Sequence, residues 1–258
     1  GKALEHREKD LAELGIKERW STLEEYFRIL KGREISLNFV TLAGHGNIRA
    51  SVIGYKDKKP TAFELKKMRA LLQKTIDSGA IGLSTGLIYP PGIYSDTDEL
   101  VSLAKSFSED RLVYTSHMRS EGKGLIESIK EIIRIAKEAN IKVHISHIKT
   151  SGKENWHKID EAISLINSAR KRGIKVTCDR YPYTASSTDL DTILPSWTYE
   201  GGSEKELRRL TSPSVQEKIK KEILHGHPDN DYWTKVSVSS VSSKKNKWME
   251  GKTLAFIS

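Results

Sequence analysis

Apolar positions along the chain switch between strand-like and helix-like spacing, and this predicts repeated strand–helix units. Leu112–Thr115, Lys142–Ser146 and Ile174–Cys178 are short apolar-rich runs typical of strands. The segments between them, Gly124–Ala139 and His157–Arg172, place their apolar residues on one face at helical spacing. These strands begin about 30 residues apart, which is the length of a βα unit.

The first hundred residues continue the same pattern. Two capping boxes, Ser21–Glu24 and Thr61–Glu64, predict helix starts. The second of these helices should run to Gly79, because glycine is a common C-terminal stop. The remaining expected elements are strands at Ile35–Ala43 and Ile81–Ser84 and a helix at Asp96–Ser108.

Strands that alternate with helices predict a parallel sheet and an α/β fold. No Gly-x-Gly-x-x-Gly turn follows a strand, which favours a (β/α) barrel over a dinucleotide-binding sheet. A full (β/α)8 TIM barrel needs eight units and the pattern supplies five, so we expect a partial barrel and a fragment of a longer chain.

The regular pattern ends after Tyr183. We therefore expect two regions, with residues 1–188 forming the partial barrel and catalytic core. Residues 189–258 would form a small helical or irregular insert near the barrel mouth. Within the insert, the pattern predicts helices at Glu204–Leu210 and Ser214–His225 and a strand at Lys235–Val238.

Composition narrows the class of protein. The 258 residues are 37% hydrophobic and 30% charged, the balance of a soluble globular protein. No apolar run is long enough to span a membrane, and the N-terminus has no apolar signal core. The single cysteine, Cys178, cannot form an internal disulfide, so we expect a cytoplasmic location and no membrane partner.

The net charge of +9 raises the question of a nucleic-acid partner. Most of the lysine clusters have acidic neighbours, and none is interleaved with aromatic residues as a single-strand binding groove would be. We therefore interpret the charge as solvated surface and expect no nucleic-acid partner.

Polar residues follow three consecutive predicted strands, where a parallel barrel builds its catalytic face. His117 and His147 occupy the same place in adjacent units, 30 positions apart. Two imidazoles on neighbouring strand ends can share one divalent metal ion, and zinc accepts such ligands. A single strand-end histidine is more often a hydrogen-bonded packing residue, and it is the matched pair that favours a metal site. His144 lies within its strand and is interpreted as structural, and His45 ends a strand without a clear partner.

Two further segments have the character of substrate loops. Ser84–Gly92 follows a predicted strand and contains two prolines, two glycines and Tyr89. Tyr183–Thr188 is rich in hydroxyl groups and follows Tyr181, and such groups suit a carboxylate or a carbonyl. Both segments are also compatible with ordinary turns.

Taken together, these segments resemble the N-acyl-D-amino-acid deacylases, or D-aminoacylases, of the amidohydrolase superfamily. The resemblance covers Trp20 to about Ala255, and several blocks carry it in the family's order. The blocks are Gly44-His-Gly-Asn-Ile-Arg49, Gly79-Ala-Ile-Gly-Leu-Ser-Thr-Gly-Leu-Ile-Tyr-Pro-Pro-Gly92, Thr115-Ser-His-Met-Arg-Ser-Glu121, Ile145-Ser-His-Ile-Lys149 with Asn155-Trp156, and Asp179-Arg-Tyr-Pro-Tyr-Thr-Ala-Ser-Ser-Thr188.

The resemblance implies hydrolysis of the N-acyl group of a small-molecule N-acyl-D-amino acid. His117 and His147 match metal ligands at the ends of barrel strands five and six. The cofactor would be Zn²⁺, with one or two divalent ions in the complete enzyme. Tyr89 matches a tyrosine that helps to polarise the scissile carbonyl or to hold the substrate.

The resemblance also implies a site for the substrate carboxylate. Lys149, Tyr181 and Ser187 match residues that hold the carboxylate of the D-amino acid. Arg119 and Glu121 match the family pattern as well. Arg119 is counted among the substrate-binding residues in a supporting role, and Glu121 receives a supporting role only.

Three parts of the family's site have no counterpart here. These are a His-x-His pair on the first strand, a bridging cysteine in a Gly-Asn-Cys-Gly turn, and a catalytic aspartate after the eighth strand. His225-Gly-His227 comes too late in the chain to be that pair. We therefore expect that missing N- and C-terminal segments complete the barrel, and that the isolated chain binds metal weakly and is inactive.

Two alternatives remain open. A dihydroorotase-like or hydantoinase-like amidohydrolase would share the strand-end histidines. Such an enzyme more often has a carboxylated lysine on strand four, where Gly82–Ser84 has none. The other alternative is a non-catalytic remnant that binds a small molecule.

Overall fold

The computed structural model describes the chain except for residues 1–7, 9–10, 108–110, 228–229 and 258. The chain divides into two compact units, residues 1–181 and residues 182–258. Within the described residues, no helix combines the length and the apolar character needed to cross a membrane.

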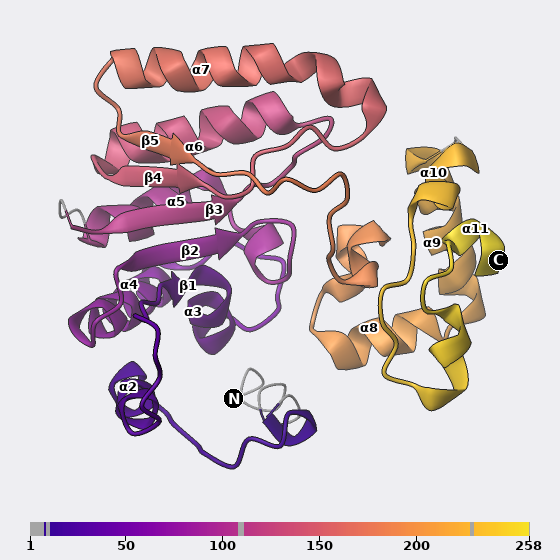
Figure 1. The fold of residues 1–258 in the computed structure, drawn as a ribbon, viewed down its shortest axis with the longest axis horizontal. Coiled ribbons are helices and arrows are strands. Elements are labelled where there is room, and N and C mark those ends of the chain that lie inside the picture. Colours follow the sequence, from indigo (N-terminus) through magenta and orange to yellow (C-terminus); the bar gives the residue numbers. More distant parts are fainter. Residues whose placement is uncertain (1–7, 9–10, 108–110, 228–229, 258) are drawn as a thin grey trace. The chain divides into compact units, whose positions relative to one another are not determined.

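The first unit is built on a five-stranded parallel sheet with strand order β1-β2-β3-β4-β5 (Figure 1). Each strand pairs with the next strand in the sequence, as in a (β/α) barrel. The predicted α/β fold with a parallel sheet is confirmed. The strands are β1 (Ala43–Gly44), β2 (Gly82–Gly86), β3 (Val113–His117), β4 (Lys142–Ile145) and β5 (Val176–Cys178).

Helices connect the strands, and successive helices pack against one another along the sheet, with α6 and α7 running beside β4 and β5 in Figure 1. Most of them begin and end close to the predicted limits. The first unit contains α2 (Leu23–Lys31), α3 (His45–Val52), α4 (Ala62–Asp77), α5 (Thr97–Ala104), α6 (Leu125–Ala139) and α7 (Ile159–Lys171), with short 3₁₀ turns at Gly92–Tyr94, Lys105–Phe107 and Lys153–Lys158.

The caps explain where these helices begin and end. The Thr61 hydroxyl accepts a hydrogen bond from the Glu64 backbone, and the Glu64 side chain accepts one from the Thr61 backbone, which confirms this capping box. Asp96 caps α5 in a similar way through the Glu99 N–H. Helix α6 ends at Asn140, which adopts the left-handed conformation common at helix C-termini.

Apolar side chains of the strands and helices form one core in this unit. Leu83, Tyr114 and Val143 come from neighbouring strands and are buried against the helices. Ile129 and Ile132 of α6 are fully buried in the same cluster. This core fixes the strand ends that carry the candidate site.

The predicted strand at Ile35–Ala43 is wrong over most of its length. Only Ala43 joins the sheet from this run, and Leu37 and Val40 are 79% and 66% exposed. β1 has a partner strand only on the β2 side among the described residues, so the preceding residues have no second ladder to join. Apolar character alone does not make a strand where no neighbour is present.

Other differences are small. The first capping box lies one residue later than predicted, with Thr22 and Glu25 in place of Ser21 and Glu24. The predicted end of the helix at Ser108 lies outside the described residues. Helix α3 was not predicted, because Gly44–Arg49 has two glycines and no clear amphipathic pattern.

The second unit consists mainly of helices. The predicted helices at Glu204–Leu210 and Ser214–His225 are present as α8 and α9, whereas the predicted strand at Lys235–Val238 is reduced to a single antiparallel bridge between Ser237 and Thr253. Its elements are α8 (Ser203–Leu210), α9 (Pro213–Gly226), α10 (Asn230–Lys235) and α11 (Leu254–Ile257), with 3₁₀ turns at Leu190–Ile193, Ser196–Tyr199 and Lys244–Met249.

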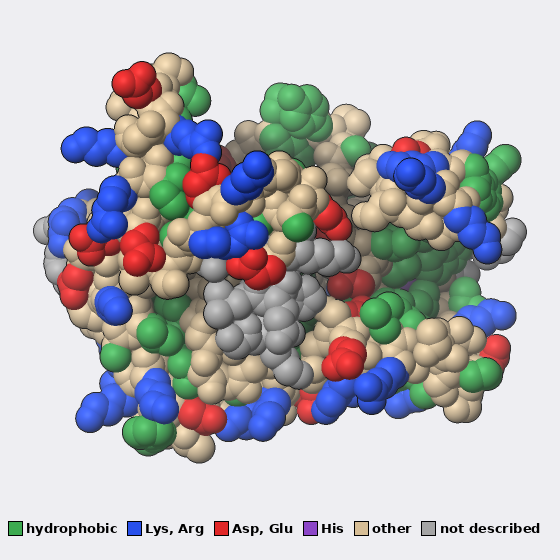
Figure 2. Space-filling model, turned by 90° about the horizontal axis from the view of Figure 1, so that it is seen from below, with side chains coloured by type: hydrophobic (Ala, Val, Ile, Leu, Met, Phe, Trp, Pro, Cys, Tyr) green, Lys and Arg blue, Asp and Glu red, His purple; other side chains and the backbone are tan. Residues whose placement is uncertain are grey.

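Basic side chains on the surface are interspersed with acidic ones on the face drawn in Figure 2. Arg134, for example, pairs with both Asp98 and Glu138, and Lys130 pairs with Glu127. Such exposed pairs contribute little to stability. The basic groups in these pairs have acidic neighbours, so they do not form a patch of one sign.

Candidate metal centre

His117 and His147 meet at the carboxyl ends of neighbouring strands. His117 is the last residue of β3, and His147 follows β4 by two residues. His117 Nδ1 lies 3.0 Å from His147 Nε2. Two nitrogens bound to one tetrahedral zinc at 2.0–2.1 Å would lie roughly 3.4 Å apart, so the facing pair fits a shared ion with a small adjustment.

The backbone at His147 is held in an uncommon conformation. Its φ angle is +41°, in the left-handed region that non-glycine residues seldom adopt. The Asp179 carboxylate accepts a hydrogen bond from the His147 N–H, and the Asp179 carbonyl accepts one from Ile148 N at 2.9 Å. The first residue after β5 therefore fixes the turn that presents His147.

Glu121 brings a carboxylate to the histidine pair. Glu121, His117 and His147 together form a group of potential metal ligands whose ligand atoms all lie within 4.8 Å of one another. Glu121 Oε1 is 2.9 Å from His147 Nδ1 and 2.6 Å from Lys149 Nζ. Glu121 is thus in contact with the ring nitrogen of His147 that faces away from His117.

Burial keeps His117 in the form that binds metals. Desolvation lowers the pKa of His117 below its ordinary value, and nearby His147 and Lys149 lower it further, whereas Glu121 opposes the shift. The ring is therefore neutral near pH 7, as a metal ligand must be. His117 Nε2 is buried and has no hydrogen-bond partner among the residues that the structure describes.

Tyr89 lies beside His117, with ring centroids 5.3 Å apart. Gly86 makes this approach possible, because a Cβ at position 86 would lie 2.8 Å from Tyr89 Cδ2. Gly86 is also the residue of β2 that pairs with His117 of β3. The absence of a side chain at the end of β2 therefore lets the loop fold back over the strand end.

The predicted carboxylate-binding residues fall into two groups. Lys149 Nζ lies 5.2 Å from the centroid of the Tyr181 ring, a cation–π distance, and the Tyr181 ring is 6.2 Å from the His147 ring. These two residues therefore adjoin the histidine pair. Ser187 belongs to the second unit, where it is exposed.

Arg119 is bound to other groups of the protein. Its guanidinium donates two hydrogen bonds to the Glu131 carboxylate on α6, at 3.0 and 3.2 Å. A third goes to the Ile93 carbonyl at 3.2 Å. This arrangement joins the segment after β3 to the loop after Tyr89. A supporting role for Arg119 is compatible with it, and direct contact with substrate stays a prediction.

His45 has the partner that sequence alone did not reveal. It is fully buried, and its Nε2 lies 2.8 Å from Glu99 Oε1. Arg49 is also buried, and it binds the other oxygen of Glu99 and the Lys58 carbonyl. The Arg49–Glu99 ion pair and the contact of His45 with Glu99 attach α3 to α5 inside the core, which is a structural role.

The contacts of Glu121 and Asp179 with His147 were not predicted from the sequence. A signal was present for both of them. Asp179 follows β5 at the same edge of the sheet at which His117 ends β3, and Glu121 is four residues beyond His117. The contacts themselves depend on side-chain conformations in two loops, and strand periodicity does not encode these.

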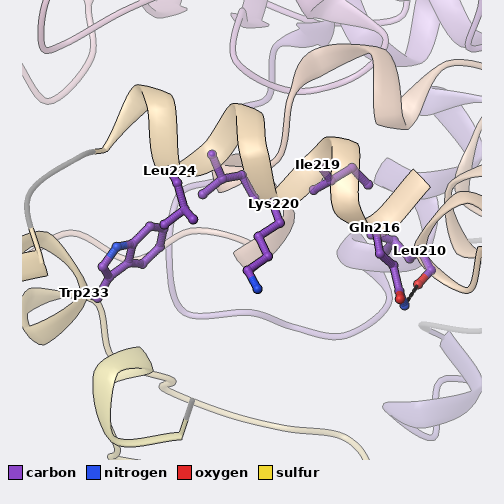
Figure 3. Close-up of a pocket in the computed structure, with 7 residues that line it drawn as sticks. Leu210, Gln216, Ile219, Lys220, Leu224 and Trp233 are labelled. Atoms are coloured by element: carbon purple, nitrogen blue, oxygen red, sulfur yellow. Dashed lines mark hydrogen bonds between the residues drawn. The ribbon is translucent and has the colours of Figure 1, made fainter. Parts of the chain in front are cut away.

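A separate hollow lies in the second unit (Figure 3). Its walls come from the apolar side of α9, with Trp233 of α10 at one end. Gln216 closes the other end by donating a hydrogen bond of 2.6 Å to the Leu210 carbonyl. Among the described residues that line it, Lys220 is the only charged one, so these residues offer no set of groups for acid–base or metal chemistry.

Comparison with known proteins gives several relatives. The chain is 34% identical over 181 residues to a D-aminoacylase of Alcaligenes xylosoxydans xylosoxydans, which is 70% of this chain and 37% of the relative. It is 32% identical over 180 residues to an N-acyl-D-glutamate deacylase of the same organism, with the same shares of the two chains. The chain therefore spans a little over a third of these relatives. No family model matches it.

Solved structures agree with the sequence relatives. The crystal structure of an N-acyl-D-glutamate deacylase from Bordetella bronchiseptica superposes with a TM-score of 0.62 and 34% identity, over 67% of this chain and 36% of that one. That protein was crystallised with zinc and a phosphonate inhibitor that mimics the tetrahedral intermediate of the reaction. The resemblance inferred from the sequence is confirmed by these matches.

Proposed function

We propose that this chain, a homologue of the N-acyl-D-amino-acid deacylases, carries part of the metal site and part of the substrate site of an enzyme that removes the N-acyl group from N-acyl-D-amino acids. The observation that carries the proposal is the facing pair His117 Nδ1 and His147 Nε2, 3.0 Å apart, with Lys149 and Tyr181 beside it.

Each of these residues has a task in the proposed reaction. His117 and His147 hold the metal ion, for which we propose zinc. When bound, zinc supplies a Lewis acid and an activated water at neutral pH. Tyr89, next to His117, donates its hydroxyl proton as a hydrogen bond to the carbonyl oxygen of the scissile amide. Lys149 gives a positive charge for the substrate carboxylate.

The grip on the substrate carboxylate extends beyond Lys149. Tyr181 contributes its hydroxyl group there, and we keep Ser187 as a further hydroxyl donor. Arg119 supports the site through Glu131 and the Ile93 carbonyl. The substrate is a small molecule, and we propose no nucleic-acid or membrane partner and a cytoplasmic location.

Catalysis needs more groups than these. Catalytic zinc sites commonly use three protein ligands, and His117 and His147 supply two imidazoles. The chain spans 37% of the D-aminoacylase that it matches. We propose that the remaining ligands and the catalytic aspartate come from parts of the protein outside these 258 residues.

The test uses the complete protein that contains this sequence, expressed from its whole reading frame. We expect zinc-dependent release of free D-amino acids from N-acetyl-D-amino acids and none from the L-enantiomers. His117→Asn and His147→Asn should each lower kcat/KM by at least about 100-fold, because each removes a metal ligand. The purified 258-residue chain alone should show no turnover.

The matched control is His157→Asn, which changes an exposed histidine outside the site. It should leave kcat/KM unchanged. Full activity of His117→Asn or His147→Asn would refute the proposal. Hydrolysis of hydantoin or dihydroorotate in place of N-acyl-D-amino acids would assign the protein to another amidohydrolase activity, and metal-dependent binding without turnover would indicate a non-catalytic remnant.

A further inference from the structure

We propose that Glu121 is a positioning residue that joins the metal site to the carboxylate site. Through one oxygen it fixes the tautomer of His147, so that Nε2 is free to bind the metal, and it holds the Lys149 ammonium group. The inference rests on the proposed function and adds to it a residue with no expected role beyond general support.

The two nitrogens of His147 face different partners. Nε2 faces His117 Nδ1 at 3.0 Å, and Nδ1 is 2.9 Å from Glu121 Oε1. A carboxylate only accepts hydrogen bonds, so Nδ1 must carry the proton in this contact. A neutral imidazole with a proton on Nδ1 has a free lone pair on Nε2. In His147 this is the nitrogen that faces His117. Carboxylates that hold metal-binding histidines in this way orient the ring and raise its basicity.

The position of Glu121 argues against direct metal binding. Its contact is with Nδ1, on the far side of the ring from the nitrogen that faces His117. An ion between the two histidines would therefore have the imidazole of His147 between itself and this oxygen of Glu121. The carboxylate acts through His147.

Lys149 and Glu121 compete for His147 Nδ1, and they favour opposite tautomers of the ring. Lys149 Nζ lies 2.9 Å from His147 Nδ1 as well as 2.6 Å from Glu121 Oε1. If the ammonium donated to Nδ1, the ring proton would lie on Nε2 and block metal binding. Glu121 prevents this, because its oxygen accepts from both Nδ1 and Nζ. The same carboxylate thus keeps Lys149 beside the metal site and prevents the ammonium group from donating a hydrogen bond to His147 Nδ1.

The first measurement is the tautomer of His147 in the complete protein, prepared without metal. Long-range ¹H–¹⁵N spectra of ¹⁵N-histidine-labelled protein distinguish a proton on Nδ1 from one on Nε2, and His147→Asn assigns the signal. We expect the Nδ1–H form in the unsubstituted chain and in Lys149→Met. We expect a change toward the Nε2–H form in Glu121→Ala. Glu121→Gln should keep the Nδ1–H form, since its amide oxygen still accepts.

The second measurement is the zinc affinity of the complete protein and of the same variants, by isothermal titration. Glu121→Ala should weaken zinc binding about 10- to 100-fold, the usual effect of removing such a partner. Glu121→Gln should weaken it less. Glu127→Gln, an exposed glutamate on α6, is the matched control and should change neither the affinity nor the tautomer. Circular dichroism verifies that each variant is folded.

The outcomes separate this inference from the proposed function. An unchanged Nδ1–H tautomer in folded Glu121→Ala would overturn the role of Glu121, even if zinc binds His117 and His147. Equal zinc affinity of His117→Asn, His147→Asn and the unsubstituted chain would overturn the metal site. The tautomer measurement would still decide the role of Glu121, because it is made without metal.

Discussion

Gly86 illustrates how a single residue shapes the candidate site. The ring of Tyr89 occupies the space that a side chain at position 86 would need. A Cβ at Gly86 would lie 2.8 Å from Tyr89 Cδ2. His117, on the neighbouring strand β3, has its ring next to that of Tyr89. A methyl group at position 86 would therefore displace Tyr89 from its place beside His117.

We predict that Gly86→Ala lowers kcat/KM of the complete protein by about 100-fold, the effect expected when a catalytic group is misplaced by about 1 Å. Zinc affinity should be retained, because the nearest atoms to the new methyl group all belong to Tyr89 and not to His117 or His147. Steady-state kinetics and titration check the two expectations. Gly32→Ala is the control, since its new methyl group meets only ordinary contacts of 3.6 Å. Full activity of Gly86→Ala would show that the position of Tyr89 is not critical.

The proposed metal ligands and their neighbours differ in how far the sequence could identify them. His117 and His147 were predicted to lie together, because parallel strands of a βα repeat end at the same edge of the sheet. The contacts of Glu121 could not be predicted, because they depend on how two loops fold. The left-handed backbone of His147 depends likewise on Asp179, which is distant in sequence.

At the scale of elements, the N-terminus of α4 gives a test with a defined pH dependence. The Lys58 ammonium and the Thr61 backbone N–H lower the pKa of Glu64 from 4.5 to about 2. A carboxyl group with a lowered folded-state pKa contributes stability that is present above its unfolded pKa. That contribution is lost as the pH falls through the folded pKa. The relevant window is therefore between about pH 4.5 and pH 2.

We predict that Glu64→Gln is less stable than the unsubstituted chain at pH 7, and that the difference disappears as the pH falls from about 4.5 to 2. Thr61→Ala loses the hydroxyl cap, which should cost about 1 kcal/mol. It also loses the hydrogen bond from the Thr61 hydroxyl to the Glu64 carboxylate, so part of its effect should disappear over the same pH range. Urea unfolding at a series of pH values measures both. A constant difference for Glu64→Gln across the range would contradict the assignment.

Capping signals made several helices predictable, and strands were less so. Thr61 and Asp96 marked the starts of α4 and α5 because their caps are local interactions. The run Ile35–Ala43 had the composition of a strand, yet only Ala43 belongs to one, and Thr41 adds a single backbone hydrogen bond, from Ile81 N to its carbonyl. A strand depends on a neighbour that can be far away in the sequence. Helix α3 was missed for a related reason, since His45 and Arg49 are stabilised inside the core by distant Glu99.

At the scale of the whole molecule, an exposed segment follows the first unit. The division falls between residues 181 and 182, and residues 182–190 are exposed and mostly without helix or strand. The sequence pattern placed the boundary at residues 188–189, within the same segment, and the two-domain organisation stays a prediction. Exposed segments of this kind are preferred sites of proteolysis.

We predict that brief treatment with chymotrypsin cuts the native chain after Tyr183, which is 72% exposed, and releases a fragment of residues 184–258. A proline follows Tyr181, so cleavage at that tyrosine should not compete. Mass spectrometry of the early products identifies the fragment, and Tyr183→Ser is the control that should abolish it. Cuts within 184–258 that come before any cut at Tyr183 would contradict a compact second unit. If instead the fragment accumulates and resists further digestion, the segment after Tyr181 acts as a linker. The residues proposed for the metal site and its neighbourhood, His117, Glu121, His147 and Lys149, all belong to the first unit, on the N-terminal side of that segment.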